Sequence, residues 1–130
     1  MAAVHMRWVP ATSLSMEGRG FEPGLLATPF DRLPASAEAV VRPPVWDLSL
    51  HSAGICVRFR TDATNLSCRW ALRNAGLAMP HMPSSGVSGV DLYALTEAGW
   101  RFLRCGVPAE ADGGSQEMEL WSGGDSVPSE

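Results

Sequence analysis

A short stretch near the middle of the chain gathers side chains that could do chemistry. The segment AMPHMPSSGVSGVDLY, residues 78–93, contains His81, two serines at Ser84 and Ser85, and Asp91. A serine that is activated by a histidine, which a carboxylate orients, is a common nucleophile of acyl transfer. Chains of this length offer such combinations by chance, and no nucleophile elbow or phosphate-binding loop accompanies this one. We therefore expect no catalytic residue here.

The alternative to catalysis is a loop that contacts a ligand or another domain, and five residues are its candidates. They are His81, Met82, Ser84, Ser85 and Asp91. Each also has a purely structural interpretation: a loop histidine that fixes its turn, a methionine that fills a gap, serines bonded to backbone, and a solvated strand carboxylate. Asp91 could also pair with an arginine on the same face. The arginines considered are Arg58, Arg60 and Arg69.

Glycines and tryptophans carry further expectations. Gly86 and Gly89 are expected to take backbone angles that other residues avoid. Three tryptophans fall on alternating apolar faces and are expected in the core, namely Trp46, Trp70 and Trp100. Trp8 and Trp121 lie outside the firm pattern. They are the better candidates for an exposed aromatic side chain that meets a sugar or a partner domain, although packing within the fold is the favoured interpretation for both.

Composition and charge exclude several classes of function. The chain has 130 residues, which suits one domain with one core. Its formal net charge is −4, and all ten basic residues are arginines that form no cluster, so no nucleic-acid partner is expected. No apolar run of about 18 residues is present, so no membrane span is expected. The first twenty residues lack the apolar run of a signal peptide, which predicts a cytoplasmic chain.

The cysteines and histidines give no sign of a disulfide framework or a metal site. Cys56, Cys68 and Cys105 are odd in number and far apart, and no CxxC or HxxxH pair occurs. We expect no metal and no cofactor. Each cysteine is interpreted as a small buried apolar residue.

Alternating apolar residues predict the elements that would position these side chains. Strands are predicted over 45–50, 55–61 and 66–72, joined by four-residue turns into an antiparallel meander. Three more strands are predicted after a loop over 73–89. They cover 90–95, 100–105 and 116–121. The pattern predicts an all-β fold, an antiparallel β-sandwich of jelly-roll-like type.

The predicted organisation has three parts. Residues 1–17 form an irregular N-terminal segment, residues 18–121 the β-sandwich, and residues 122–130 a flexible tail. Residues up to about Pro44 are expected to be irregular or edge structure. One short helical turn is possible in PASAEAVV, and the Pro43–Pro44 pair should stop it.

Several words of the sequence, taken in order, resemble a known module. These words are DRLP (31–34), VWDLSLHSAGICVRFRTDATNLSCRW (45–70), MPHMPSSGVSGVDLY (79–93) and WRF (100–102). Together they resemble the N-terminal β-sandwich domain that precedes the catalytic domain in a group of bacterial SGNH-type, GDSL-like hydrolases. The resemblance covers roughly residues 18–107. RFRTD and the stretch from His81 to Tyr93 are its most specific parts.

The resemblance implies a non-catalytic accessory domain. Such a domain would dock on an SGNH catalytic domain, in cis or in trans, and shape its active-site entrance. The parent enzyme would be an ester hydrolase, with acetyl esters on carbohydrate as the suggested substrates. An alternative from another class is a stand-alone carbohydrate-binding module, which rests on analogy between β-sandwiches and needs an exposed aromatic side chain. A truncated gene product is a third interpretation.

The resemblance also draws attention to GGDS, residues 123–126, because its Ser126 could be a GDS catalytic serine. Such a serine must lie at a strand-to-helix turn and needs a base and oxyanion donors from other segments. Only four residues follow Ser126, and the partner Asp and His of that family lie far downstream of the serine. We therefore expect the catalytic machinery to be absent from this chain.

Overall fold

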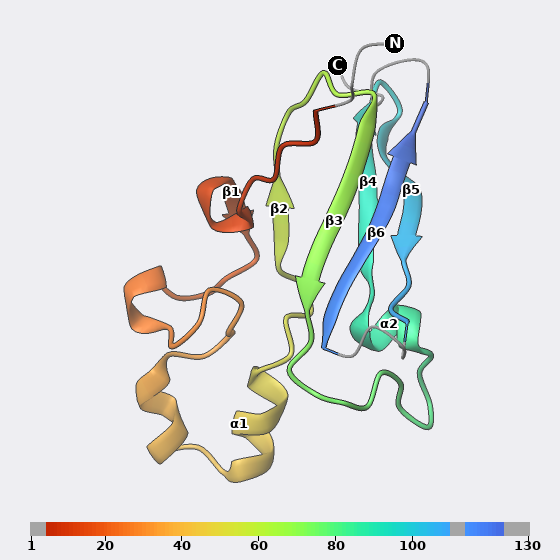
Figure 1. The fold of residues 1–130 in the computed structure, drawn as a ribbon. Coiled ribbons are helices and arrows are strands. Elements are labelled where there is room, and N and C mark those ends of the chain that lie inside the picture. Colours follow the sequence, from red (N-terminus) through yellow and green to blue (C-terminus); the bar gives the residue numbers. More distant parts are fainter. Residues whose placement is uncertain (1–4, 110–113, 124–130) are drawn as a thin grey trace. The chain divides into compact units, whose positions relative to one another are not determined.

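The structure is a computed structural model that describes residues 5–109 and 114–123. The chain divides into two compact units, residues 1–59 and residues 60–130, which Figure 1 shows in red to yellow and in green to blue. In the described part, strands pair only in antiparallel fashion and form three two-stranded sheets. The predicted all-β fold is therefore confirmed.

The first unit consists of short elements. They are the 3₁₀ helices at Ala11–Ser13, Pro23–Leu25 and Ala35–Ala39, the strands β1 (Ser15–Glu17) and β2 (Cys56–Arg58), and the helix α1 (Pro43–Ser49). Strands β1 and β2 pair with Met16 opposite Val57. An exposed ion pair of 3.2 Å joins Arg58 to Glu17 across the same two strands. The helical turn predicted in PASAEAVV is the third 3₁₀ helix.

Residues 45–50 were predicted as a strand, and this prediction is wrong, because residues 45–49 belong to α1 and Leu50 is its C-cap residue. Pro43 and Pro44 occupy the first turn of that helix, where no backbone N–H donor is needed and the proline φ is already helical. Trp46, Ser49 and Leu50 are the less exposed residues. Their spacing of three and four follows one helix face and not a strand. The proline pair therefore starts a helix as well as ending the preceding turn.

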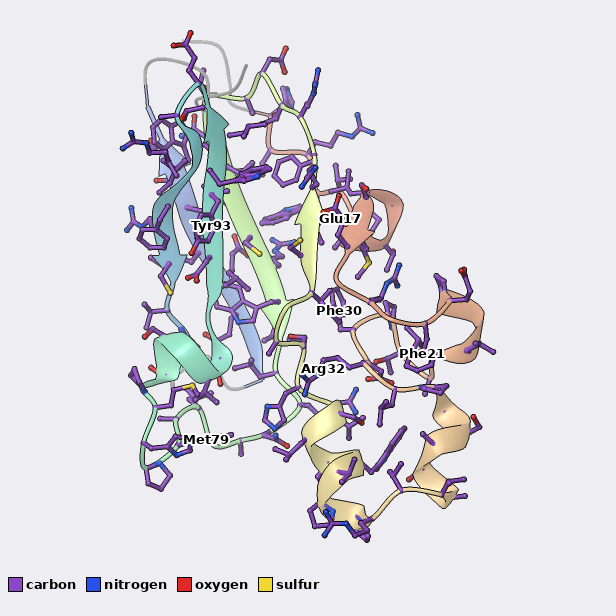
Figure 2. The ribbon with its side chains drawn as sticks, turned by 180° about the vertical axis from the view of Figure 1, so that it is seen from behind. Glu17, Phe21, Phe30, Arg32, Met79 and Tyr93 are labelled. Atoms are coloured by element: carbon purple, nitrogen blue, oxygen red, sulfur yellow. The ribbon has the colours of Figure 1, made fainter. Side chains whose placement is uncertain are left out.

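Buried polar contacts hold the DRLP segment. Asp31 is 1 % exposed, and its carboxylate accepts hydrogen bonds from the backbone N–H and the hydroxyl of Thr28, at 3.0 and 2.7 Å. The Arg32 guanidinium, labelled in Figure 2, donates a 2.6 Å hydrogen bond to the carbonyl oxygen of Leu48. Its backbone N–H donates to Ser49. Arg32 thereby satisfies two carbonyl oxygens at the C-terminal end of α1, one through its cationic side chain and one through its backbone N–H.

The second unit contains the long strands. Its elements are β3 (Asn65–Ala71), the short helix α2 (Ser84–Ser88), β4 (Val90–Thr96), β5 (Gly99–Gly106) and β6 (Ser115–Ser122). Figure 1 shows β6 alongside β3. The predicted strands over 66–72, 90–95, 100–105 and 116–121 are confirmed. The predicted meander is wrong, because β2 pairs with β1 and β3 pairs with β6, which is more than forty residues away in sequence.

The core of the second unit lies between its two sheets. Its buried apolar residues are Leu77, Leu92, Ala94 and Leu120. Gly106 lies where a side chain would meet Trp70 and Leu120, since a Cβ there would come within 3.1 and 3.2 Å of them. No helix in the described ranges is long and apolar enough to cross a membrane.

Candidate functional site

The loop before β4 is ordered by its own backbone. Met79 and Met82 exchange two backbone hydrogen bonds, of 2.9 and 3.1 Å, which close a tight turn with Pro80 and His81 at its tip. His81 is exposed there. Figure 2 shows Met79 in this loop at the α2 end of the unit. The turn therefore presents the His81 side chain to solvent at a fixed place.

Two hydrogen bonds to Ser88 hold the end of α2 on the unit. The indole Nε1 of Trp70 donates to the Ser88 carbonyl oxygen at 2.8 Å. The Ser88 hydroxyl is buried and donates to the Leu77 carbonyl oxygen at 2.9 Å. The core strand β3, the start of the loop and the end of α2 are thus tied together at one residue. The loop is consequently part of the packed fold.

Gly89 is required by lack of space and not by its backbone angles. Its φ of −85° is open to every residue, so the expected special conformation is wrong. A Cβ at this position would overlap the carbonyl oxygen of Ser85 and come within 2.7 Å of that of Gly106. It would also lie 3.2 Å from the sulfur of Cys105. The close approach of α2 to β5 therefore depends on a glycine.

Asp91 and Cys105 face each other across β4 and β5. Burial is the main cause that raises the pKa of the Cys105 thiol, and the hydrogen bond and negative charge of Asp91 raise it further. The sulfur also lies 3.8 Å from the Ser85 carbonyl oxygen. Ser85, Cys105 and Asp91 consequently form one continuous contact from α2 to the outer face of the β4–β5 hairpin.

The structure does not assemble a Ser–His–Asp set from the candidate residues. Within the described ranges, no hydrogen bond or ion pair joins His81 to Ser84, Ser85 or Asp91. Ser84 and Ser85 are half-buried on α2. Met82 is exposed, and its side chain lies beside Gly86, where a Cβ would come within 3.3 Å of it. The candidates therefore share one end of the unit without the relay geometry of an activated serine.

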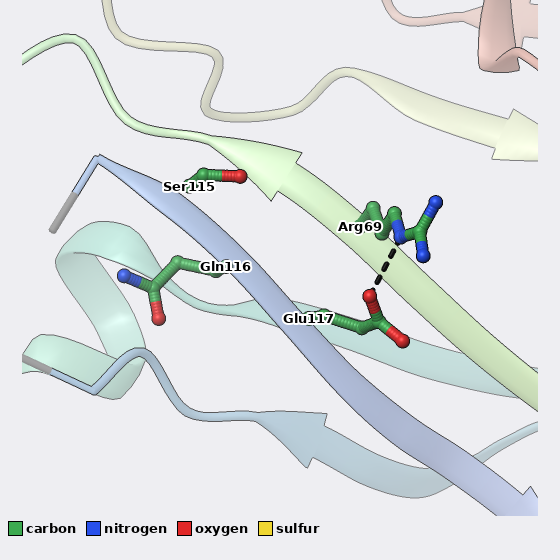
Figure 3. A pocket seen from close by; sticks show the side chains of 4 residues that line it. All are labelled: Arg69, Ser115, Gln116 and Glu117. Atoms are coloured by element: carbon green, nitrogen blue, oxygen red, sulfur yellow. Dashed lines mark hydrogen bonds and ion pairs between the residues drawn. The ribbon is translucent and has the colours of Figure 1, made fainter. Parts of the chain in front are cut away.

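Two of the arginines considered as partners for Asp91, Arg58 and Arg69, have other contacts. Arg69 forms a 2.6 Å ion pair with Glu117, and both side chains are about half exposed. The pair lines a shallow pocket together with Ser115 and Gln116 (Figure 3). An exposed pair of this kind contributes little to stability. It offers no enclosed space in which a substrate could be held.

The cysteines differ in their surroundings, and they were all expected to be buried. Cys56 is exposed, so this expectation is wrong for it. Cys68 and Cys105 are half-buried, and burial raises the pKa of the Cys68 thiol. Among the described residues, no cluster of His, Cys, Asp and Glu could hold a metal ion. Ser126 lies outside the described residues.

The tryptophans are placed differently from the expectation in one important case. Trp100 is 51 % exposed, so its expected burial is wrong. Trp46 and Trp70 are half-buried. Trp8, for which a packed position was also considered, is exposed. Trp121 is half-buried, and its indole N–H is buried with no hydrogen-bond partner among the described residues.

A signal for the exposure of Trp100 was present in the hairpin. Only two residues, 97 and 98, separate the pair Thr96 and Gly99 that closes the turn. A two-residue turn places Leu95 opposite Trp100 and Tyr93 opposite Phe102, as observed. Since Tyr93 lies on the outer face, its cross-strand neighbours lie there too. The predicted strands over 90–95 and 100–105 left four residues between them, and the register of the hairpin was therefore open.

Comparison with known proteins decides the family. A family model described as "GxDLY: N-terminus of Esterase_SGNH_hydro-type" matches residues 6–127. The chain belongs to this family. GxDLY domains form the N-terminus of SGNH-type esterases, as the resemblance implied. The comparison with curated proteins gives no match.

One solved structure is similar to the GxDLY domain in fold. It is a crystal structure of a candidate GDSL-like lipase from Bacteroides ovatus ATCC 8483, with a TM-score of 0.79 and 24 % sequence identity. The match covers 92 % of this chain and 33 % of that one. The chain thus spans about a third of the length of the protein that it matches.

The five-residue pattern in the family's name occurs at Gly89–Tyr93, and each of its fixed positions has a physical role here. Gly89 admits two carbonyl oxygens where a side chain would collide. Asp91 meets Cys105 on the outer face, and Leu92 is buried in the core. Tyr93, labelled in Figure 2 on β4, is half exposed beside Phe102. The pattern thus connects α2, the core and the outer face of one hairpin.

Proposed function

We propose that this GxDLY domain is a non-catalytic accessory domain that docks on an SGNH catalytic domain, in cis or in trans. In this role it shapes the entrance of the partner's active site. The observation that carries the proposal is the family match over residues 6–127, because the family is defined by its place at the N-terminus of SGNH-type esterases. The reaction of the parent enzyme is ester hydrolysis, with carbohydrate esters as the proposed substrates.

The loop around His81 is the proposed contact at the active-site entrance. Loops on a rigid scaffold commonly carry binding residues, because the scaffold fixes their ends. Here the turn between Met79 and Met82 is closed by two backbone hydrogen bonds, and Ser88 is tied to Trp70. A side chain presented by such a loop loses little conformational entropy when it meets a partner. The remaining proposed contacts on this end are Met82, Ser84, Ser85 and Asp91.

A substitution of His81 tests the proposal in an esterase chain in which this domain is joined to an SGNH catalytic domain. We expect His81→Ala to lower kcat/KM for an acetyl ester by roughly tenfold, which corresponds to about 1.4 kcal/mol of transition-state stabilisation. His5→Ala is the matched control, since His5 is also exposed and lies in the first unit. Equal kcat/KM and equal affinity between the domains in both variants would rule out the contact role.

A stand-alone carbohydrate-binding module is the second candidate function, and the exposure of Trp100 favours it. Exposed aromatic rings are common contacts for sugars, and Trp100 is half exposed on β5. The test is a glycan array probed with the wild-type chain and with Trp100→Ala. Binding that disappears in the variant would support this function. An array without any binding would dispose of it.

A further inference from the structure

The outer face of the β4–β5 hairpin carries four large apolar side chains that are about half exposed. Tyr93 and Leu95 on β4 lie opposite Phe102 and Trp100 on β5. Their exposed fractions are 50 % and 43 % on β4, and 55 % and 51 % on β5. Four neighbouring large apolar side chains at this exposure form a patch, and patches of this kind mark interaction surfaces more often than scattered apolar residues do.

The rings within the patch are held in a geometry that suits a protein surface. The Tyr93 and Phe102 rings lie 5.6 Å apart between centroids, with an angle of 71° between their planes. This edge-to-face arrangement is favourable and fixes both rings before any partner arrives. A sugar ring stacks on a flat aromatic face, and two rings at 71° do not form one flat platform. A partner with an uneven surface, such as a folded domain, is more complementary to this pair of rings.

The patch is continuous with the loop end through the Asp91–Cys105 contact. Asp91 precedes Tyr93 by two positions on the same face of β4, and Cys105 lies opposite it. Cys105 in turn contacts the Ser85 carbonyl oxygen of α2. A partner that contacts α2 at Ser85 is therefore adjacent to the patch. Because the family lies at the N-terminus of SGNH-type esterases, that partner is the catalytic domain.

We infer that the patch formed by Tyr93, Leu95, Trp100 and Phe102 is the apolar centre of the interface with the SGNH catalytic domain. This inference rests on the proposed function and adds the surface that carries the binding energy. The inference requires an apolar area on the catalytic domain that excludes water from the two cross-strand pairs, Tyr93–Phe102 and Leu95–Trp100. Tyrosine and tryptophan at the centre of such an interface are its usual energetic hot spots.

The inference is tested by titrating the 130-residue chain with the SGNH catalytic domain of a GxDLY-type esterase, by calorimetry. Hot-spot side chains lose on the order of 30-fold in affinity when truncated. We expect such a loss for Trp100→Ala and for Phe102→Ala. Phe21→Ala is the matched control, because Phe21 is 42 % exposed and lies in the first unit. It should bind like the wild type.

A measurement on the unaltered chain covers the case in which a variant does not fold. Hydrogen–deuterium exchange should show new protection of residues 90–106 when the catalytic domain is bound. Wild-type binding without that protection, or with equal affinity in Trp100→Ala and Phe21→Ala, would overturn this inference and leave the proposed function intact. No wild-type binding would overturn the proposed function itself. A wild-type dimer that Trp100→Ala converts to monomer, or a glycan that needs Trp100, would assign the patch to another occupant.

Discussion

The indole Nε1 of Trp70 donates a 2.8 Å hydrogen bond to the carbonyl oxygen of Ser88, and this bond ties the core strand β3 to the end of α2. The Ser88 hydroxyl in turn donates a hydrogen bond to the carbonyl oxygen of Leu77. Gly89 follows Ser88 directly in the chain. The placement of the loop is therefore set by the core.

Replacement of Trp70 by Phe should destabilise the second unit by about 1–3 kcal/mol, because the Ser88 carbonyl oxygen loses its donor in a poorly solvated position. Trp121→Phe is the matched control. The Trp121 indole N–H is buried without a partner in the described part of the chain, so its removal breaks no hydrogen bond. Urea denaturation of both variants measures the difference. An equal loss of unfolding free energy in the two variants would show that the loss comes from the smaller ring volume and not from the hydrogen bond.

Replacement of Gly89 by Ala should be strongly destabilising, by about 2–4 kcal/mol, since the new methyl group overlaps backbone oxygens of α2 and β5 that cannot move aside separately. Gly86→Ala is the control, since Gly86 lies in the preceding helix α2. Its methyl group would meet only the flexible Met82 side chain, and alanine favours a helix by up to about 1 kcal/mol. In thermal melting, Tm should be lower than in the wild type for Gly89→Ala and not for Gly86→Ala. A Tm unchanged from wild type would contradict the steric role.

Replacement of Asp31 by Ala should destabilise the first unit by about 2–3 kcal/mol, because it removes both hydrogen bonds from Thr28 to a carboxylate that is almost fully buried. Asp47→Ala is the control, since Asp47 is exposed on α1 and should change stability by no more than about 0.5 kcal/mol. Limited proteolysis with mapping of the cleavage sites reports on this unit by itself. Faster cleavage in residues 5–59 is expected for Asp31→Ala only.

The rates at which the three thiols react with iodoacetamide should follow their solvent exposure and their pKa values. Cys56 is exposed, whereas the pKa values of Cys68 and Cys105 are raised, so less of their reactive thiolate is present at neutral pH. Cys56 should therefore be alkylated first at pH 7.5, as peptide mass spectrometry can establish. Faster modification of Cys105 than of Cys56 would contradict the contact with Asp91.

The same shifts give a pH dependence of stability. A raised folded-state pKa of a thiol contributes stability that is fully present below its ordinary pKa of 9.0 and is lost as the pH rises through the folded value. Stability should therefore decline above about pH 9. Cys105→Ala should reduce this decline compared with wild type, in denaturation curves recorded at pH 7.5 and pH 10. An identical decline in both would show that other groups cause it.

Helix α1 shows how a local signal can be misread. Val45 to Leu50 alternates in apolarity, which predicts a strand, yet the preceding Pro43 and Pro44 fit the first turn of a helix. Seven residues are too few for periodicity alone to separate the two structures. The hydrogen bond from Arg32 to Leu48 then stabilises the C-terminal end of that helix, and this contact bridges sixteen residues of sequence. The sequence pattern contained no indication of that partner.

The sequence by itself determined the four strands of the second unit, the loop before β4 and the membership of the chain in its family. These features follow from local alternation and from words such as GVDLY, which are read without knowledge of distant contacts. The tertiary structure alone decided that β3 pairs with β6, that Gly89 is needed for space, and that Trp100 faces outward. Alternation separates two faces of a strand, but only the packing of another element decides which face is covered.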